Sequence, residues 1–144
     1  MTTQSKPWTD IVIDTRDYTV YRDKYPVTEG HILFVPKEQD WDHLAKCYKA
    51  AYAWGYEWTH TGYCEAFNLG QNCGEAAGQT IDWPHVHLIP RRKGDMADPT
   101  GGVRHVIPEK GNYKVNNIYK KINGTYTTEE IVDATNKILE GDLK

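Results

Sequence analysis

Two histidines separated by a single residue are the side chains of this chain best suited to chemistry. His85 and His87 stand in a β-branched, apolar run, behind a Gly-rich loop and just before a basic cluster. Side chains at positions i and i+2 of a strand face the same side, so the two imidazoles are expected to point together, about 7 Å apart, with Val86 and Leu88 facing a core. Paired imidazoles beside a flexible, amide-rich loop are suited to binding and attacking a phosphate.

Imidazole is a capable nucleophile near neutral pH because its unperturbed pKa is about 6.5. Attack on an α-phosphorus forms a phosphoramidate and divides one displacement into two easier steps. The attacking nitrogen must be unprotonated, so the other ring nitrogen has to donate its proton to a fixed acceptor. The remaining requirements of phosphoryl transfer are positioning and charge stabilisation. Gln79 and Thr80, at the end of the Gly-rich loop, are candidates to contact phosphate oxygens.

The elements that must position these residues are strands packed around one long helix. Apolar residues three and four positions apart predict an amphipathic helix from its N-cap, Asp40, to about Trp58, and a second helix over 127–139. This pattern indicates an α+β domain on an antiparallel sheet. β-Branched and aromatic composition predicts strands at 17–22, 30–35, 62–69 and 80–90, with a further short strand at 103–107.

Length, charge and cysteine content limit the possible classes. A chain of 144 residues can form one domain with a hydrophobic core, and its net charge of −3 argues against a nucleic-acid partner. No apolar run reaches the roughly 18 residues that span a membrane, and the polar N-terminus lacks the core of a signal peptide. The three cysteines are odd in number and widely spaced, which argues against a disulfide framework and favours a cytoplasmic location. The only basic cluster, residues 91–93, is either a solvated loop or a ligand contact.

Three motifs follow one another in the chain. They are Asp23-x-x-Pro26-x-x-x-Gly30-His31, the loop Asn68-x-Gly70-x-Asn72-x-Gly74 to Thr80, and His85-Val86-His87-Leu88-Ile89-Pro90-Arg91. Together they resemble the histidine-triad (HIT) superfamily of nucleotide hydrolases and transferases. The resemblance covers about residues 18–108 of a single HIT-like domain, 1–144, with 109–144 as a C-terminal extension. The run at 101–108 is similar to a bacterial branch of diadenosine tetraphosphate hydrolase-like proteins.

The resemblance implies a fold, an assembly and roles for individual residues. The fold is an antiparallel sheet of about five strands with one long helix and a C-terminal helix, and the assembly is a homodimer whose sheets join across the interface. His85 aligns with the family's nucleophile and His87 with its third histidine, while Asp23 aligns with the acceptor of ribose hydroxyls. No cofactor and no metal are implied. The substrate-binding set is Asp23, His31, Asn72, Gln79 and Thr80, and apolar side chains expected to bracket the base are Val20 or Tyr21, and Ile32.

Trp83 stands where the family has its first histidine. In the family, a backbone carbonyl near that position accepts the proton of the nucleophile's other nitrogen, and Trp83 still carries a carbonyl. Strand parity places its indole on the His85 side. Indole has one N–H donor and no acceptor, so it cannot replace a histidine. The sequence therefore predicts slower hydrolysis than in a full triad, and a Trp83→His substitution is expected to accelerate the chemical step about tenfold.

The residues and the resemblance together predict a hydrolase or nucleotidyl transferase. It would act at the α-phosphorus of a nucleotide, a dinucleoside polyphosphate or a nucleoside phosphoramidate through a nucleotidyl-histidine, without nucleic acid or membrane as a partner. Two alternatives stay open. One is a nucleotide-binding module whose catalysis is weakened or lost at Trp83. The other is a metal-binding protein in which His85, His87 and His31 chelate zinc or another divalent ion.

Overall fold

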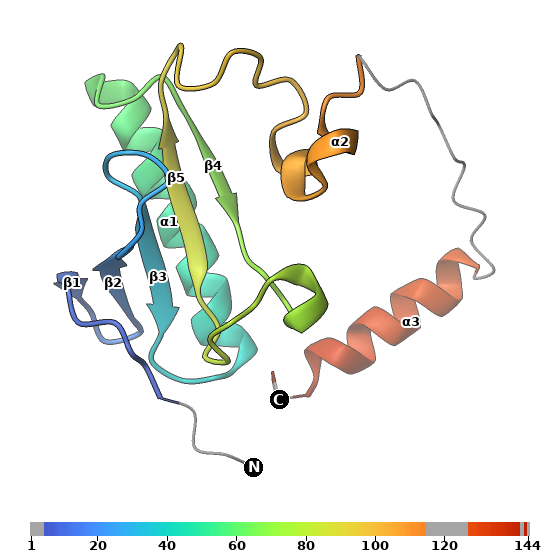
Figure 1. The fold of residues 1–144 in the computed structure, drawn as a ribbon. Helices are drawn as coiled ribbons and strands as arrows, with labels where there is room; N and C mark the ends of the chain where they lie inside the picture. The colour runs from blue at the N-terminus through green and yellow to red at the C-terminus, as the bar shows by residue number, and fades with distance from the viewer. Residues whose placement is uncertain (1–4, 115–126, 142, 144) are drawn as a thin grey trace. The chain divides into compact units, whose positions relative to one another are not determined.

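A computed structural model describes residues 5–114, 127–141 and 143 of the chain. Contacts within the chain form two compact units, Met1–Ala97 and Asp98–Lys144. The first unit contains a five-stranded sheet and a long helix, and the second contains short helical segments and one longer helix (Figure 1). The expectation of one domain over residues 1–144 stays a prediction.

The sheet of the first unit has the strand order β1-β2-β3-β5-β4. Every neighbouring pair is antiparallel, so the predicted α+β class with a five-stranded antiparallel sheet is confirmed. Tyr21 pairs with Leu33, and Leu33 pairs with His87, so these three side chains share one face of the sheet. The strands are β1 Ile11–Asp14, β2 Tyr18–Arg22, β3 Ile32–Pro36, β4 Ala66–Gly70 and β5 Val86–Arg91.

Helix α1, Trp41–Thr61, covers the other face of the sheet (Figure 1). It begins as predicted at Asp40, whose carboxylate accepts a hydrogen bond from the His43 N–H at 2.8 Å. It packs so closely on the sheet that a Cβ on Gly55 would overlap the ring of Phe67. The fully buried side chains between helix and sheet include Val20, Phe34, Cys47, Ala51, Val86 and Leu88.

Several boundaries of the predicted strands differ in the structure. Strand β1 was not expected, although its Ile-Val-Ile-Asp sequence suits an edge strand. The strand predicted from residue 62 begins at Ala66, because Gly62 ends α1 in the left-handed conformation with φ of 80°. The strand predicted from residue 80 begins at Val86. Pro84 has no N–H to add to a ladder, and residues 80–85 form a loop.

The second unit contains a 3₁₀ turn at Gly102–Val106, helix α2 at Pro108–Gly111 and helix α3 at Thr128–Leu139. The strand predicted at 103–107 is therefore wrong. Arg104 stabilises the turn instead, because its guanidinium donates to the carbonyls of Lys110 and Gly111, both at 3.1 Å. Helix α3 agrees with the predicted C-terminal helix. Within the described ranges, no helix is both long and apolar enough to cross a membrane.

Candidate active site

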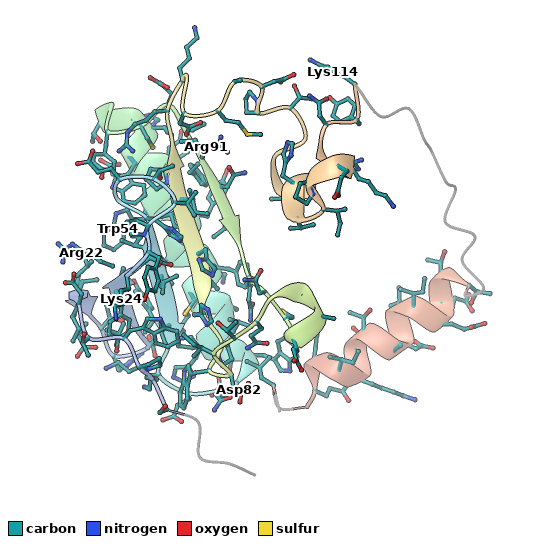
Figure 2. All side chains as sticks on the ribbon, in the orientation of Figure 1. Arg22, Lys24, Trp54, Asp82, Arg91 and Lys114 are labelled. Carbon is teal, nitrogen blue, oxygen red and sulfur yellow. The ribbon has the colours of Figure 1, made fainter. Side chains whose placement is uncertain are left out.

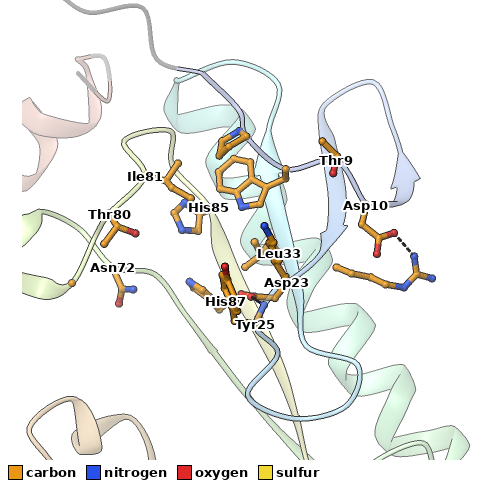
Figure 3. A pocket seen from close by; sticks show the side chains of 15 residues that line it. Thr9, Asp10, Asp23, Tyr25, Leu33, Asn72, Thr80, Ile81, His85 and His87 are labelled. Atoms are coloured by element: carbon orange, nitrogen blue, oxygen red, sulfur yellow. Dashed lines mark hydrogen bonds and ion pairs between the residues drawn. The ribbon is translucent and has the colours of Figure 1, made fainter.

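A pocket of about 730 Å³ opens on the face of the sheet opposite α1. His85 and His87 enter it from the beginning of β5, and Asp23 enters it from the end of β2 (Figure 3). Side chains of every expected type, acidic, amide, hydroxyl and imidazole, therefore meet in one cavity. The rest of its lining is Pro7, Trp8, Thr9, Asp10, Arg22, Lys24, Tyr25, Leu33, Asn72, Gly78, Thr80 and Ile81.

His85 directly precedes β5 and lines this pocket. Its Nδ1 lies 2.8 Å from the carbonyl oxygen of Trp83. A carbonyl can only accept, so Nδ1 carries a proton, and in the neutral form of the ring the lone pair is on Nε2. The structure records no hydrogen-bond partner for this Nε2 among the residues it describes. The Trp83 carbonyl thus occupies the place of the fixed acceptor that nucleophilic attack requires.

His87 is oriented by hydrogen bonds that start at the backbone of the β2–β3 loop. The Val27 N–H donates to Nδ1 of His31 at 3.1 Å, so the neutral His31 ring carries its proton on Nε2. This Nε2 lies 2.9 Å from Nδ1 of His87 and donates to it. His87 must then hold its own proton on Nε2. That nitrogen is buried and has no hydrogen-bond partner among the described residues, so its N–H donor is unsatisfied within this part of the chain.

Burial in the protein keeps the His31 and His87 rings neutral at pH 7. Burial lowers the pKa of His87 to about 4, and the neighbouring His31 and His85 rings act in the same direction against Asp23. Burial also lowers the pKa of His31, although Asp23 opposes the shift. His87 therefore acts near neutral pH as a neutral hydrogen-bond donor and not as a cation.

One carboxylate oxygen of Asp23 binds the backbone of the β2–β3 loop, and the other lies near His31 and His87. Its Oδ1 accepts from the Tyr25 N–H at 2.8 Å, while Oδ2 lies 3.4 Å from His31 Nε2 and 3.8 Å from His87 Nδ1. The turn-capping role and the pocket role of Asp23 are thus compatible.

Asp23, His31 and His87 form a cluster whose potential metal-ligating atoms all lie within 4.8 Å of one another. This set differs from the predicted chelate, because Asp23 takes the place of His85. A metal-bound histidine donates its other ring N–H to an acceptor. Nδ1 of His31 instead accepts from the Val27 N–H, so a metal on Nε2 would require a ring deprotonated at both nitrogens. The hydrogen bonds therefore favour neutral histidines over a metal centre.

Only some of the predicted substrate-binding residues of the Gly-rich loop line the pocket. Asn72 and Thr80 line the pocket, but Gln79 does not. Oε1 of Gln79 accepts from the Gly74 N–H at 2.7 Å, and Nε2 donates to the carbonyls of Ile81 and Asp82 at 3.0 and 3.1 Å. We therefore reassign Gln79 from phosphate contact to closure of the loop. His31 also lies outside the lining, behind His87.

The apolar wall of the pocket includes Trp8 and Leu33, which sequence reasoning missed. The Trp8 ring lies 4.9 Å from the His85 ring and 5.8 Å from the Tyr21 ring, measured between centroids. Of the side chains expected to bracket a base, Val20 and Ile32 instead face α1, and only Tyr21 lies on the pocket face. The available signal was a large apolar residue, Trp8, within an otherwise polar N-terminal segment.

Trp83 lies on the pocket face of the sheet but does not line the cavity. Its Nε1–H donates to the Pro36 carbonyl at 2.9 Å, and its ring packs with Trp8 against Tyr21, Leu33 and Val35. The indole is thus a packing group, whereas the backbone carbonyl of the same residue orients His85.

The basic cluster stands at the opposite end of β5 and is paired within the protein. The Arg91 guanidinium donates to both oxygens of Asp95 at 2.8 Å and to Oδ1 of Asn68 at 2.6 Å. Arg92 donates to the Glu29 carbonyl at 2.8 Å. The sequence left two alternatives for this cluster, a solvated loop and a ligand contact, and the structure supports neither. These arginines connect neighbouring segments of the fold.

The family model described as "HIT domain" matches residues 5–94, more than half of the chain. The chain belongs to the HIT domain family. The match begins at residue 5, so it includes the segment that carries Trp8.

Two curated relatives show the range of proteins that share this domain. The chain is 30% identical over 105 residues to the nitrilase and fragile histidine triad fusion protein of Caenorhabditis elegans, covering 64% of this chain and 22% of that protein. It is 29% identical over 92 residues to the adenosine 5'-monophosphoramidase of Candida albicans, covering 56% and 60% of the two chains. The chain thus spans less than two thirds of the length of these two relatives.

Solved structures show the same fold. A HIT family protein from Bacillus anthracis superposes with a TM-score of 0.54 at 25% identity, covering 91% of this chain and 86% of that one. A zinc-bound histidine triad family protein from Mycobacterium smegmatis gives a TM-score of 0.55 at 25% identity, covering 61% and 69%.

Proposed function

We propose that this protein is a nucleotide hydrolase or nucleotidyl transferase that acts at the α-phosphorus through a nucleotidyl-histidine on His85. The observation that carries the proposal is the hydrogen bond from Nδ1 of His85 to the Trp83 carbonyl, which leaves Nε2 free in the pocket. Membership of the HIT family supports it, as does the relative named as an adenosine 5'-monophosphoramidase.

The first step forms the bond between Nε2 of His85 and the α-phosphorus. The bond from phosphorus to the leaving group breaks, and the leaving group departs with its electron pair. Positive charge then develops on the imidazole, and the Trp83 carbonyl stabilises it by accepting the Nδ1–H bond. The buried Nε2–H of His87 donates to a phosphate oxygen as charge accumulates there.

The second step breaks the new phosphorus–nitrogen bond. Water attacks the phosphorus, the electron pair returns to Nε2 of His85, and the proton released by water passes to the leaving group or to solvent. The products are a nucleoside monophosphate and the leaving group, with one water consumed. When a different nucleophile replaces water, the same intermediate yields nucleotidyl transfer.

The remaining pocket residues suit the parts of a nucleotide. Trp8 and Leu33 provide an apolar wall for the base, and Asp23 can accept hydrogen bonds from ribose hydroxyls. Asn72 and Thr80 offer donors to phosphate oxygens on the side of the Gly-rich loop (Figure 3). The proposed substrates are nucleotides with a leaving group on the α-phosphorus, including dinucleoside polyphosphates and phosphoramidates.

We propose in addition that the protein forms a homodimer through β4 and α1. Strand β4 is outermost in the sheet, and Tyr52 on α1 and Tyr63 beyond its end are exposed. A second copy would pair with the open edge and cover these rings. Sedimentation as a 16.5 kDa monomer at micromolar concentration would contradict the dimer. Three free cysteines support the proposed cytoplasmic location.

The second candidate function is a nucleotide-binding module with little catalysis. Trp83 favours it, because the first histidine of the triad is absent and no imidazole occupies that position. The two candidates share the pocket and differ only in turnover.

The test is hydrolysis of a panel of nucleotides by the purified protein, comparing the wild type with His85→Ala. His60→Ala is the matched control, since His60 is an exposed histidine of α1 whose side chain has one recorded contact among the described residues, the ring of Tyr56. We expect His85→Ala to lose at least about a thousandfold in kcat with nucleotide affinity retained, and His60→Ala to retain activity. Unchanged turnover in His85→Ala would refute the mechanism. Nucleotide binding without turnover in the wild type would establish the binding module.

A further inference from the structure

The loop that holds the Val27 N–H against His31 is itself tied to β5 by a side chain. Strand β3 pairs with β5 only as far as Ile32 opposite Leu88, so the Pro90 carbonyl lies beyond the ladder. The hydroxyl of Thr28 donates to that carbonyl at 2.6 Å. A side-chain bond thus continues the connection between the two segments where the backbone pairing stops.

A second contact holds the loop one residue further along. Arg92 donates to the Glu29 carbonyl at 2.8 Å, and its guanidinium lies 4.8 Å from the Tyr63 ring centroid. Gly30, with φ of 93°, passes beneath this tyrosine so closely that a Cβ would overlap the hydroxyl. The backbone of residues 28–30 is therefore fixed relative to the end of β5.

We propose that Thr28 is a positioning residue of the active site, and that its bond to the Pro90 carbonyl fixes the tautomers of His31 and His87. Thr28 does not line the pocket and touches no proposed substrate atom. It precedes His31 by three residues, and its own carbonyl accepts the His31 N–H at 3.2 Å. The bond to Pro90 holds the loop in which the Val27 N–H donates to Nδ1 of His31. This bond sets which ring nitrogen of His31, and in turn of His87, carries the proton.

The pair of rings has two opposite arrangements of protons, and only one of them suits a phosphate. With the Val27 N–H in place, His31 donates to His87, and His87 holds its own proton on Nε2, which has no recorded partner among the described residues. Without it, His31 can hold its proton on Nδ1, accept from Nδ1–H of His87 and leave a lone pair on Nε2 of His87. Phosphate oxygens are acceptors, so a lone pair at this position repels them. The inference rests on the proposed function for its catalytic consequence.

The test compares Thr28→Val, which retains the shape and removes the hydroxyl, with Thr28→Ser, which retains the hydroxyl. Long-range ¹H–¹⁵N correlation spectra of histidine-labelled protein report which ring nitrogen of His31 and His87 is protonated. We expect the wild type and Thr28→Ser to show His87 protonated at Nε2, and Thr28→Val to show a mixture. Because one hydrogen bond to the reacting phosphate weakens, kcat of Thr28→Val should fall about tenfold while KM changes less than about twofold.

A wild-type tautomer pattern in folded Thr28→Val would overturn the proposal, and so would a shifted pattern with unchanged kcat. If Thr28→Val does not fold, Arg92→Gln removes the other anchor and is judged by the same spectra. The spectra need no turnover, so failure of the proposed function, seen as an inactive wild type, is distinct from failure of the positioning role. With an inactive wild type, the tautomers alone decide.

Discussion

At the start of β5, His85 and His87 each retain a ring nitrogen without a recorded partner in the described part of the chain, whereas at its end Arg91 uses all three guanidinium nitrogens within the protein. An unpaired buried donor costs free energy unless a ligand completes it, whereas a guanidinium whose three nitrogens already donate within the protein has fewer N–H groups left for a ligand. The histidine pair and the basic cluster thus lie at the two ends of β5, where Figure 2 labels Arg91. The start of β5, where we propose catalysis, is distinguished by ring nitrogens without partners and not by positive charge.

The largest effect on stability is expected at the paired end. Arg91→Ala breaks three hydrogen bonds and leaves Asp95 and Asn68 without their cation, which should lower the free energy of unfolding by about 2 to 3 kcal/mol. Urea denaturation measures this loss, and nucleotide turnover should stay close to the wild type. Lys93→Ala, at an exposed neighbouring position, is the control and should change neither quantity. A large loss of turnover in stable Arg91→Ala protein would place function at this end as well.

The second prediction concerns His87 and pH. Its pKa is about 4 in the folded protein, against about 6.5 in an unfolded chain, so between these values only the unfolded chain binds the proton. Stability should therefore fall as pH falls, by about 2 kcal/mol between pH 7 and pH 5 from this residue alone. Urea denaturation at both pH values, repeated with His87→Asn, isolates this contribution. An equal decrease in the two proteins would show that His87 is not held neutral.

The smallest effect is expected at Trp83, where the structure changes the expectation drawn from the sequence. The carbonyl that orients His85 is retained by any residue, while the indole packs against the sheet and donates to Pro36. Trp83→His should therefore cost about 1 to 2 kcal/mol of stability and change kcat by less than about twofold. Denaturation and steady-state kinetics measure the two effects. A tenfold gain in kcat would restore the interpretation of Trp83 as a weakened triad position.

Local patterns were enough to predict the parts of the site that depend on neighbouring residues. Alternation along β5 placed Val86 and Leu88 in the core and His87 on the other face, and the structure agrees. The Asp40 cap and the periodicity of α1 are equally local. The orienting carbonyl lies two residues from His85, within reach of sequence reasoning.

The parts that sequence reasoning missed depend on contacts between distant segments. Which of Ile32 and Leu33 faces the pocket depends on strand register, and the pairing of Leu33 with His87 joins residues 54 positions apart. Arg91 donates to Asn68, which is 23 positions away in the sequence, and the Trp8 ring of the N-terminal segment contacts the His85 ring. Gln79 illustrates another limit, because its type suits phosphate contact but its amide is used by its own loop.

The most direct test of the account is rapid quenching of a single turnover followed by mass spectrometry of the protein. The account predicts an acid-labile nucleotidyl adduct on the peptide that contains His85, formed and consumed at rates consistent with kcat and absent from His85→Ala. An adduct on another residue, or single-turnover hydrolysis that proceeds with no adduct at any time, would contradict it.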